Sequence, residues 1–353
     1  MDPQLQQART RDGVTIAWVS VGQGPSLIHL PGVPFSHLQA EWRIPVVRRA
    51  FEGLARNLRL IQYDGRGSGT SQRDVSDLSF EAMLADLDAV VAASGVERAT
   101  LLGFYDSVPL AIAYAARHPM LVTSLILFGG STRGWTPMSG SGTQALLSLM
   151  ERDWDMFVES ATHAWLGWPD RESGRLAADW FRTATTPAVA REVMRMFSGV
   201  DVSAEAATVG CPVLVLHRRD AQVIPLAISE ELATALPDAQ LRIVEGSSAS
   251  LFFEPNEAIV RDIVEFVTGG SDALRSTGTA RPPATRDERP SGLTPRELEV
   301  LRLIAGGGSN AEIAHRLGLS VNTVERHVSN LYRKIDARGR ADATAFAVRR
   351  GIA

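Results

Sequence analysis

The chain of 353 residues has almost no cysteine and no long apolar run. Its single cysteine, Cys211, cannot form an internal disulfide, so the sequence does not require an oxidising compartment. No stretch reaches the roughly 18 uninterrupted apolar residues of a membrane span, and residues 1–13 are polar, unlike a secretion signal. We therefore expect a cytoplasmic protein with Cys211 as a buried thiol, and we expect no membrane contact, metal or cofactor.

The chain also has little net charge, but its two ends differ. From Leu293 onward ten Arg and Lys face six Asp and Glu, which is a net charge of +4. Because the whole chain carries −4, the first 292 residues carry −8. Negative charge repels nucleic acid, so we expect any DNA contact at the carboxyl end.

Residues 269–292 separate two regions with different patterns. This segment is rich in Gly, Pro, Ser, Thr and charge, which predicts a flexible linker between domains at 1–268 and 293–353. In the first domain, apolar runs alternate with helical patterns, which predicts an α/β fold with a parallel sheet covered on both faces. The expected strands are 27–30, 58–63, 99–104, 124–128, 212–216 and 241–244, and the clearest helices are 80–94 and 109–118.

The segment from about 133 to 207 interrupts this alternation and is mostly helical. It contains five of the seven tryptophans, namely Trp135, Trp154, Trp165, Trp168 and Trp180. An insertion of this kind can form a cap over the carboxyl ends of the strands, where open α/β sheets bind ligands. The rings either pack the cap itself or line a pocket for a small apolar molecule.

Three landmarks of the first domain occur in the order found in α/β hydrolases. They are the loop 31–34 after the first expected strand, the turn 64–71, and the strand 99–104 that runs into a helix. The turn reads DGRGSGTS and matches the family pattern Asp-x-Arg-Gly-x-Gly-x-Ser. Residues 1–268 therefore resemble the α/β-hydrolase fold, and the resemblance implies a Gly-x-Ser-x-Gly nucleophile elbow after the strand.

The expected elbow lacks its serine. It reads GFYDS over 103–107, so Tyr105 stands at the nucleophile position and Ser107 at the second glycine. Ser107 could be the nucleophile only if the hydroxyl moved two residues into the helix. Tyr105 could act only with a neighbour that perturbs its pKa from about 10, and the sequence provides none.

The acid and base positions also lack the residues that the family pattern requires. The resemblance places Ala249 at the histidine and Ala221 at the acid, with Asp220 one residue early. No histidine falls in the expected loop, although His37 could face the pocket. We therefore predict no catalytic residues and no enzyme activity, with the degenerate positions Tyr105, Ala221 and Ala249. The predicted ligand site consists of Val33, Tyr105, Asp106, Trp135, Trp165 and Ala249.

Residues 293–352 resemble the helix-turn-helix domain of the LuxR family. The likeness rests on LTPRELEVL at 293–301, SNAEIA at 309–314 and SVNTVERHV at 320–328. Thr294 with Glu297, and Ser309 with Glu312, form capping-box patterns at two helix starts. Gly318 should end the second helix, and an apolar stripe of Val324, Val328, Leu331 and Ile335 should face the core.

The LuxR resemblance implies specific roles in binding double-stranded DNA. Glu325, Arg326 and Ser329 would face base edges, because Arg can pair with guanine and Glu can accept from cytosine. Asn310, Asn322, Thr323 and Lys334 would contact phosphates. A last helix at 342–350 resembles the one through which such domains pair, which implies a homodimer on a two-fold related site.

Together these patterns predict a ligand-responsive transcriptional regulator with an inactive α/β-hydrolase-type sensor. One alternative is an active esterase or lyase fused to a DNA-binding domain. Another is a first domain that serves only for dimerisation or for binding a partner protein.

Overall fold

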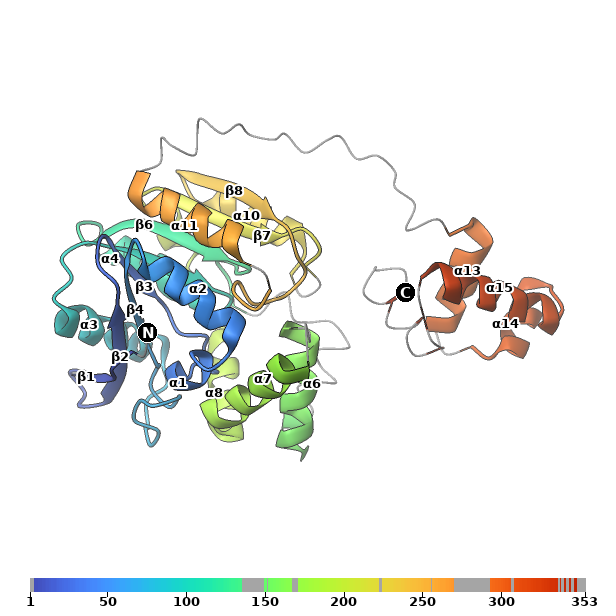
Figure 1. Ribbon diagram of the computed structural model, residues 1–353, viewed down its shortest axis with the longest axis horizontal. Coiled ribbons are helices and arrows are strands. Elements are labelled where there is room, and N and C mark those ends of the chain that lie inside the picture. The colour runs from blue at the N-terminus through green and yellow to red at the C-terminus, as the bar shows by residue number, and fades with distance from the viewer. Residues whose placement is uncertain are drawn as a thin grey trace. The chain divides into compact units, whose positions relative to one another are not determined.

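The computed structural model describes residues 3–134, 149–150, 152–166, 171–221, 224–254, 256–269, 293–305, 308–335, 337, 340, 343 and 346–347. The chain divides into two compact units, Met1–Thr277 and Gly278–Ala353 (Figure 1). Trp135, Trp168 and most of the predicted last helix lie outside the described residues. Among the helices that are described, none combines the length and apolarity that crossing a bilayer would demand.

An eight-stranded sheet forms the centre of the first unit, with strand order β1-β2-β4-β3-β5-β6-β7-β8. β2 pairs antiparallel with β1 and β4, and the remaining neighbours are parallel. The strands are β1 (Gln6–Arg9), β2 (Thr15–Val21), β3 (Ser26–His29), β4 (Arg59–Tyr63), β5 (Ala99–Phe104), β6 (Val122–Phe128), β7 (Val213–Arg218) and β8 (Ala239–Val244). The predicted α/β class is confirmed, and the sheet is mostly parallel, with β2 as the antiparallel exception to the predicted parallel sheet.

The six predicted strands are present as β3 to β8, but β2 was missed although it reads TIAWVSV and buries five of its seven residues. β3 to β7 are largely buried, as expected for strands covered on both faces, whereas β8 at the sheet edge is mostly half-buried. The sequence analysis did not predict β1 and β2. β1 reads QQAR and buries only Ala8, so its apolar pattern is too weak to identify an edge strand.

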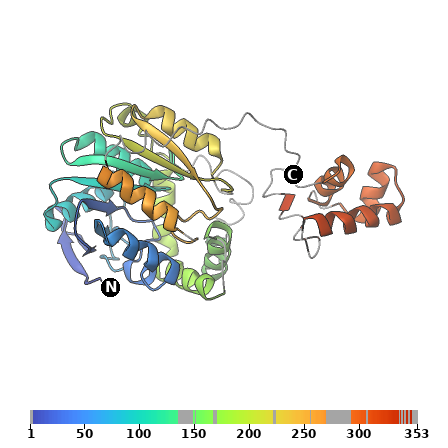
Figure 2. The same cartoon turned by 45° about the horizontal axis from the view of Figure 1, so that its top comes forward.

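Helices cover both faces of the sheet (Figures 1 and 2). α2 packs against α11 within one apolar core, and α3 and α4 belong to a second core that shares the same strands. α3 matches its prediction, but α4 begins at Ser107 rather than at Pro109. The helices outside the cap are α1 (Leu38–Glu41), α2 (Pro45–Ala55), α3 (Phe80–Ser94), α4 (Ser107–Arg117), α10 (Leu226–Ala235) and α11 (Glu257–Gly269).

The segment interpreted as a cap contains α6 (Trp154–Leu166), α7 (Arg171–Ala184), α8 (Pro187–Phe197) and the short α9 (Ser203–Ala206). α6 packs against α7, and the two run side by side in green in Figure 1. Thr186 caps the start of α8 by accepting a hydrogen bond from the Val189 N–H, and Pro187 occupies its first turn. Cys211, in the loop before β7, is half-buried rather than buried as predicted, and burial raises the pKa of its thiol to about 11.

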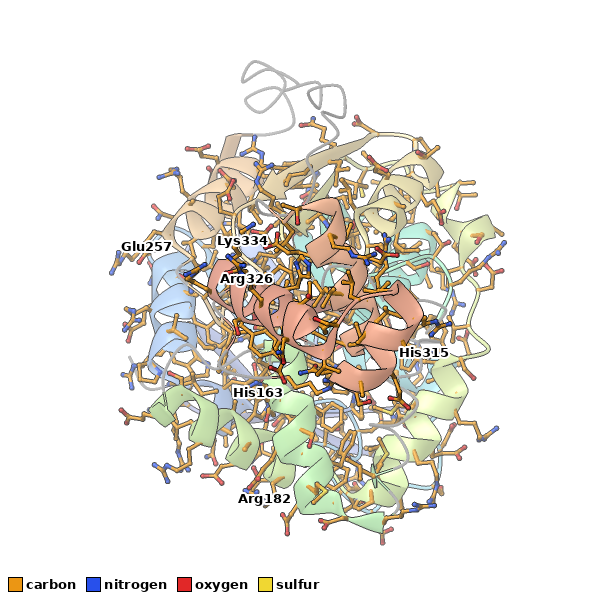
Figure 3. All side chains as sticks on the ribbon, turned by 90° about the vertical axis from the view of Figure 1, so that its right-hand side faces the viewer. His163, Arg182, Glu257, His315, Arg326 and Lys334 are labelled. Carbon is orange, nitrogen blue, oxygen red and sulfur yellow. The ribbon has the colours of Figure 1, made fainter. Side chains whose placement is uncertain are left out.

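Among the described residues of the second unit, three helices are defined, α13 (Pro295–Ala305), α14 (Asn310–Leu317) and α15 (Val321–Lys334). Both predicted capping boxes are present, at Thr294 with Glu297 and at Ser309 with Glu312. Gly318 ends α14 with φ of 62°, a conformation that favours glycine. The predicted stripe is confirmed, because Val324, Val328 and Leu331 are buried and Ile335 packs against them. Arg326 and Lys334 project from α15 (Figure 3).

Candidate functional site

The strand-to-helix turn after β5 has the strained backbone expected of a nucleophile elbow. Tyr105 has φ of 51° and is the only non-glycine residue in the described chain with a positive φ. Its N–H donates to the Phe128 carbonyl at 3.0 Å, and its carbonyl accepts from the Val108 N–H at 3.1 Å. A Cβ at Gly103 would lie 2.9 Å from the Ser107 carbonyl oxygen. The turn therefore needs a small residue at 103, and it carries the Tyr105 ring at its tip.

Ser107 has a structural role in this turn. Its side chain accepts a hydrogen bond from the Phe104 N–H and donates one to the Phe104 carbonyl, each at 2.9 Å. Ser107 is fully buried and lies outside the pocket lining. A nucleophile must reach the substrate, so this geometry does not support the alternative in which Ser107 attacks.

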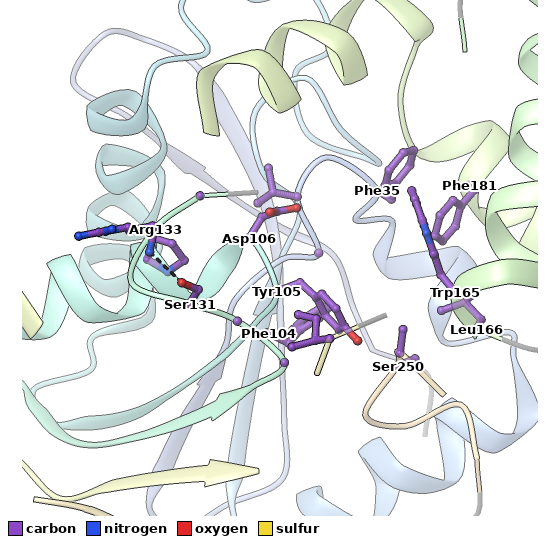
Figure 4. Close-up of a pocket in the computed structure, with 18 of the residues that line it drawn as sticks. Phe35, Phe104, Tyr105, Asp106, Ser131, Arg133, Trp165, Leu166, Phe181 and Ser250 are labelled. Atoms are coloured by element: carbon purple, nitrogen blue, oxygen red, sulfur yellow. Dashed lines mark hydrogen bonds between the residues drawn. The ribbon is translucent and has the colours of Figure 1, made fainter. Parts of the chain in front are cut away.

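A pocket of about 130 Å³ lies between this elbow and the cap (Figure 4). Its floor comes from the loops that follow β3, β5 and β6, which end at the same edge of the parallel sheet, and α6 and α7 of the cap form its other wall. The lining residues are Gly32, Val33, Phe35, Phe104, Tyr105, Asp106, Pro109, Gly129, Gly130, Ser131, Arg133, Gly134, Trp165, Leu166, Trp180, Phe181, Ile224, Ala249 and Ser250.

Five of the six predicted ligand residues line this pocket, namely Val33, Tyr105, Asp106, Trp165 and Ala249. The sixth, Trp135, lies outside the described residues. The sequence analysis missed Phe35, Trp180 and Phe181. Trp180 was identified only as part of a tryptophan-rich cap, and Phe35 follows the loop 31–34 directly. An aromatic residue next to a loop that was already assigned to the site was a signal that could have been used.

The pocket lining contains no histidine, and each of the seven histidines is among the described residues. His29 lies buried behind the pocket, stacked on Phe104 with ring centroids 5.2 Å apart, and burial lowers its pKa to about 3. His37 precedes α1, and its backbone N–H donates to the Glu41 carboxylate. His217 pairs with the Ser229 hydroxyl at 2.9 Å. No imidazole is therefore placed to take a proton from a group at position 105.

The acid position is also unsuited to catalysis. Ala221 is half-buried and Asp220 is exposed, and neither lines the pocket. Ala249, at the histidine position, does line it, and the Ala249 N–H donates to the Trp165 carbonyl at 2.8 Å. This hydrogen bond joins the loop after β8 to the last turn of α6.

An ion pair links the two loops that would carry the acid and the base. Arg218, at the end of β7, is 1% exposed, and its Nη1 lies 3.3 Å from a Glu254 carboxylate oxygen. Its guanidinium also donates to the carbonyls of Glu245 and Leu251. Glu254 accepts from the N–H groups of Ser247 and Ser248. Arg218 thus fixes the segment 245–254, from which Ala249 and Ser250 enter the pocket.

The Tyr105 hydroxyl is a neutral polar group in a mostly apolar site. Burial raises the pKa of Tyr105 above its ordinary value, although the positive charge of Arg218 acts in the opposite direction. The phenol is therefore protonated at neutral pH. It can donate or accept a hydrogen bond, but it is a poor base and a poor nucleophile.

In the second unit, α15 presents the residues that were predicted to read DNA. Asn322, Glu325, Arg326 and Ser329 are exposed, and Thr323 is half-buried beside the N-cap Ser320, whose hydroxyl it meets at 2.7 Å. Arg326 has no ion-pair partner among the described residues. Asn310, half-buried at the start of α14, leaves its Oδ1 without a hydrogen bond within the described chain.

Lys334 differs from the expectation of a purely phosphate-facing side chain. Its Nζ donates to the Glu297 carboxylate at 2.7 Å and so joins α15 to α13. Burial favours the protonated form of Glu297, but the hydrogen bonds from Lys334 and Thr294 outweigh it and lower the pKa of that carboxyl. Lys334 therefore has a structural partner, in addition to any role in contacting DNA.

Comparisons with known proteins find matches to each of the two domains. Residues 25–168 match the profile of the alpha/beta hydrolase fold, and residues 291–347 match that of bacterial regulatory proteins of the luxR family. The chain is 26% identical over 272 residues to the AB hydrolase superfamily protein YisY of Bacillus subtilis, covering 73% of this chain and 97% of that protein. It is 27% identical over 228 residues to a putative carbamate hydrolase RutD of Caulobacter sp., covering 62% of this chain and 84% of that protein.

Among solved structures, an esterase RhEst1 from Rhodococcus sp. aligns with a TM-score of 0.65 and 24% identity, over 74% of this chain and 98% of the esterase. An esterase from Exiguobacterium antarcticum aligns with a TM-score of 0.64 and 20% identity, over 75% of this chain and 99% of that one. At these identities the structures show the fold alone. The chain therefore joins an α/β-hydrolase-fold domain to a carboxyl-terminal LuxR-type DNA-binding domain.

Proposed function

We propose that this protein is a transcriptional regulator whose first domain binds a small apolar molecule without hydrolysing it. The second domain supplies contact with double-stranded DNA. The regulator acts in the cytoplasm as a homodimer, with one helix-turn-helix on each half of a two-fold related site. Binding of the small molecule shifts the balance between states that bind DNA well and states that bind it poorly.

The observation that carries this proposal is a phenol at the tip of a strained strand-to-helix turn, where the family pattern has its nucleophile. Hydrolysis by a serine requires a neighbouring base that takes the proton and an acid that orients the base. Tyr105, Ala249 and Ala221 stand at those three positions, and the lining of the pocket contains no imidazole. The pocket itself is retained, which supports binding as its purpose.

The second candidate is an active hydrolase that also binds DNA. It is favoured by the relatives, which are named as a putative carbamate hydrolase and as esterases. The substituted elbow weighs against it, because losing residues that act as a catalytic unit costs about six orders of magnitude in turnover.

Ester hydrolysis distinguishes the two candidates. Purified full-length protein is incubated with 4-nitrophenyl acetate and 4-nitrophenyl butyrate, and release of 4-nitrophenol is compared with that for Tyr105→Phe and for buffer. We expect all three rates to agree. Saturable turnover that Tyr105→Phe abolishes would make the protein an enzyme.

Regulation is tested by DNA binding. A binding site is first selected from random DNA with the full-length protein, and compounds are then screened for a rise in melting temperature. A compound present at about 100 times its dissociation constant stabilises the protein by roughly 2.7 kcal/mol. We expect such a compound to change the affinity for the selected DNA, and we expect Ala249→Phe, which fills the pocket, to abolish the change. If no compound stabilised the first domain, a role in dimerisation or in binding a partner protein would be favoured.

A further inference from the structure

We propose that the pocket takes an uncharged ring compound, about the size of a singly substituted benzene, that carries a hydrogen-bonding oxygen. This inference rests on the proposed function, because it names the class of molecule to which the regulator responds. The ring would lie against the aromatic wall of the pocket, and the oxygen would meet the hydroxyl of Tyr105.

The size of the ligand follows from the volume. The cavity measures about 130 Å³. Apolar cavities of about 150 Å³ in proteins are known to bind benzene. A ring with one short substituent therefore fits, whereas a long acyl chain or a fused polycyclic compound does not fit without movement of the cap.

The aromatic wall favours a planar ligand. Phe35 and Phe181 are stacked with ring centroids 4.4 Å apart and an angle of 10° between their planes. The ring centroid of Trp165 lies 6.2 Å from that of Phe35 and 6.1 Å from that of Phe181. Figure 4 shows these three rings together on one side of the pocket, across from Tyr105. Aromatic rings attract one another beyond the effect of buried area alone, so a planar ring gains more here than an aliphatic chain.

Two glycines make the opposite side of the pocket narrow and flat. A Cβ at Gly129 would lie 3.0 Å from the Tyr105 ring, and a Cβ at Gly32 would lie 3.0 Å from the Phe104 ring. Glycine at these positions therefore lets both rings lie directly against the backbone, and it leaves a slot between them and the aromatic wall.

Hydroxyl groups set the polar requirement. Neither Tyr105 nor Ser250 hydrogen-bonds its hydroxyl to a partner in the described residues, and the Tyr105 oxygen points toward Ser250 in Figure 4. Burial raises the pKa of Tyr105, so its hydroxyl stays protonated and can donate to a ligand oxygen. An apolar ligand without oxygen would cover this donor and leave it unsatisfied, which carries a free-energy cost.

Charged residues lie at the edge of the slot. Arg133 is paired with Asp201 at 3.3 Å, its side chain is 67% exposed, and it points away from the aromatic wall in Figure 4. The Asp106 carboxylate is also on the side away from Phe35 and Trp165. An ionised group carried into the aromatic part would therefore lose its water without gaining a partner there. Two charged rivals are a cation near Asp106, because aromatic rings also attract cations, and an anion at the Tyr105 hydroxyl, where the positive charge of Arg218 acts.

Four probes of similar size separate these possibilities. Acetophenone carries a neutral oxygen, ethylbenzene has no polar group, benzoate is an anion and benzylamine is a cation at neutral pH. Calorimetry on the full-length protein measures the dissociation constant of each probe. We expect acetophenone to bind most tightly, about 2- to 12-fold more tightly than ethylbenzene, as a net hydrogen bond provides.

Matched variants locate the oxygen. Tyr105→Phe should abolish the preference for acetophenone over ethylbenzene: acetophenone should bind less tightly, and ethylbenzene should bind equally or more tightly because no hydroxyl is left unsatisfied. Tyr114→Phe is the control, because Tyr114 lies on α4 outside the pocket and hydrogen-bonds Asp88. It should change neither affinity.

Three outcomes would overturn the ligand class: tightest binding of benzoate or benzylamine, equal loss of acetophenone and ethylbenzene in Tyr105→Phe, or no binding of any probe. None of these results would by itself remove the sensor. Turnover of 4-nitrophenyl acetate would remove the sensor and leave the ligand class standing, so the two failures can be told apart.

Discussion

The two domains differ in what they share with their relatives. The DNA-binding domain retains its capping boxes, its apolar stripe and its exposed helix face, so its structure and its expected function go together. The first domain has the sheet, a strained elbow and a pocket, and its pocket lining contains Tyr105 and Ala249 but no histidine. Under the proposed function, this domain would keep the scaffold of the hydrolases without their reaction.

The largest effect should come from the ion pair that fixes the first domain's pocket loop. Arg218→Met leaves Glu254 and two carbonyls without their buried partner. Breaking such a pair typically costs about 3–5 kcal/mol. Urea unfolding followed by tryptophan fluorescence measures the loss. Arg219→Met is the matched control, since the Arg219 side chain is 57% exposed and its ion pair with Glu245 should contribute about 0–1 kcal/mol. Similar losses of unfolding free energy in both variants would show that the Arg218–Glu254 ion pair stabilises the domain no more than an exposed pair does.

The second effect tests whether the DNA-binding domain reads sequence as its intact helix suggests. Arg326→Ala should weaken binding to the selected DNA site by about 1–3 kcal/mol, because a side chain that pairs with a base edge is lost. Binding to scrambled DNA should change far less. Fluorescence anisotropy on both duplexes at one salt concentration gives the comparison. If both duplexes lost affinity equally, Arg326 would be a phosphate contact rather than a specificity residue.

Lys334 should have a smaller and less selective effect. Lys334→Ala removes one cation near the DNA and should reduce the slope of log affinity against log salt by about 0.9. The variant also loses the hydrogen bond to Glu297, so its melting temperature must be measured alongside. Glu297→Gln is the control for that structural part. An unchanged salt slope together with a lower melting temperature would assign Lys334 to the fold alone.

The last effect concerns pH, and here Glu41 and Asp64 of the first domain should behave in the opposite way to Glu312 of the second. Burial raises the pKa of Glu41 to about 8 and that of Asp64 to about 6. Because these folded-state values exceed the ordinary ones near 4, their contribution is complete in acid and is lost as pH rises toward 8. Hydrogen bonds from Ser309 lower the pKa of Glu312, so its contribution is present above its ordinary value of 4.5 and is lost below it.

Calorimetric melting of the full-length protein from pH 4 to 8 can follow both domains. We expect Glu41→Gln to flatten the decline of the first domain between pH 5 and 8 and to leave the second domain unchanged. An identical pH profile in wild type and Glu41→Gln would mean that Glu41 titrates normally.

The sequence was most informative where local chemistry decides the structure. Ser309, Glu312 and Gly318 each act within a few residues, so both ends of α14 could be predicted. The elbow was also predictable, because a strand, a tight turn and a helix are adjacent in the chain. Ala249 could be assigned only by resemblance, since its place in the pocket depends on strands far apart in sequence.

Contacts between residues that are far apart in the sequence were not predicted. Phe35 and Phe181 form a closely stacked pair although 146 positions separate them in the numbering. Arg218 and Glu254 meet across the loop after β8, and neither residue stands out by type or spacing. Such contacts arise only when the sheet and the cap have formed, so the composition of the pocket wall had to come from the structure.

The hydrogen bond between Ala249 and Trp165 has a consequence for how a signal leaves the first domain. Under the proposed function, a ligand that shifts Trp165 would move the backbone after β8 through the hydrogen bond to the Trp165 carbonyl, and the chain continues from there through α11, which ends at Gly269. The sole covalent path to the second domain starts at that helix end. Ala249, which lines the pocket, is thus less than twenty-five residues from the exit of the chain, about the length of two ordinary helices.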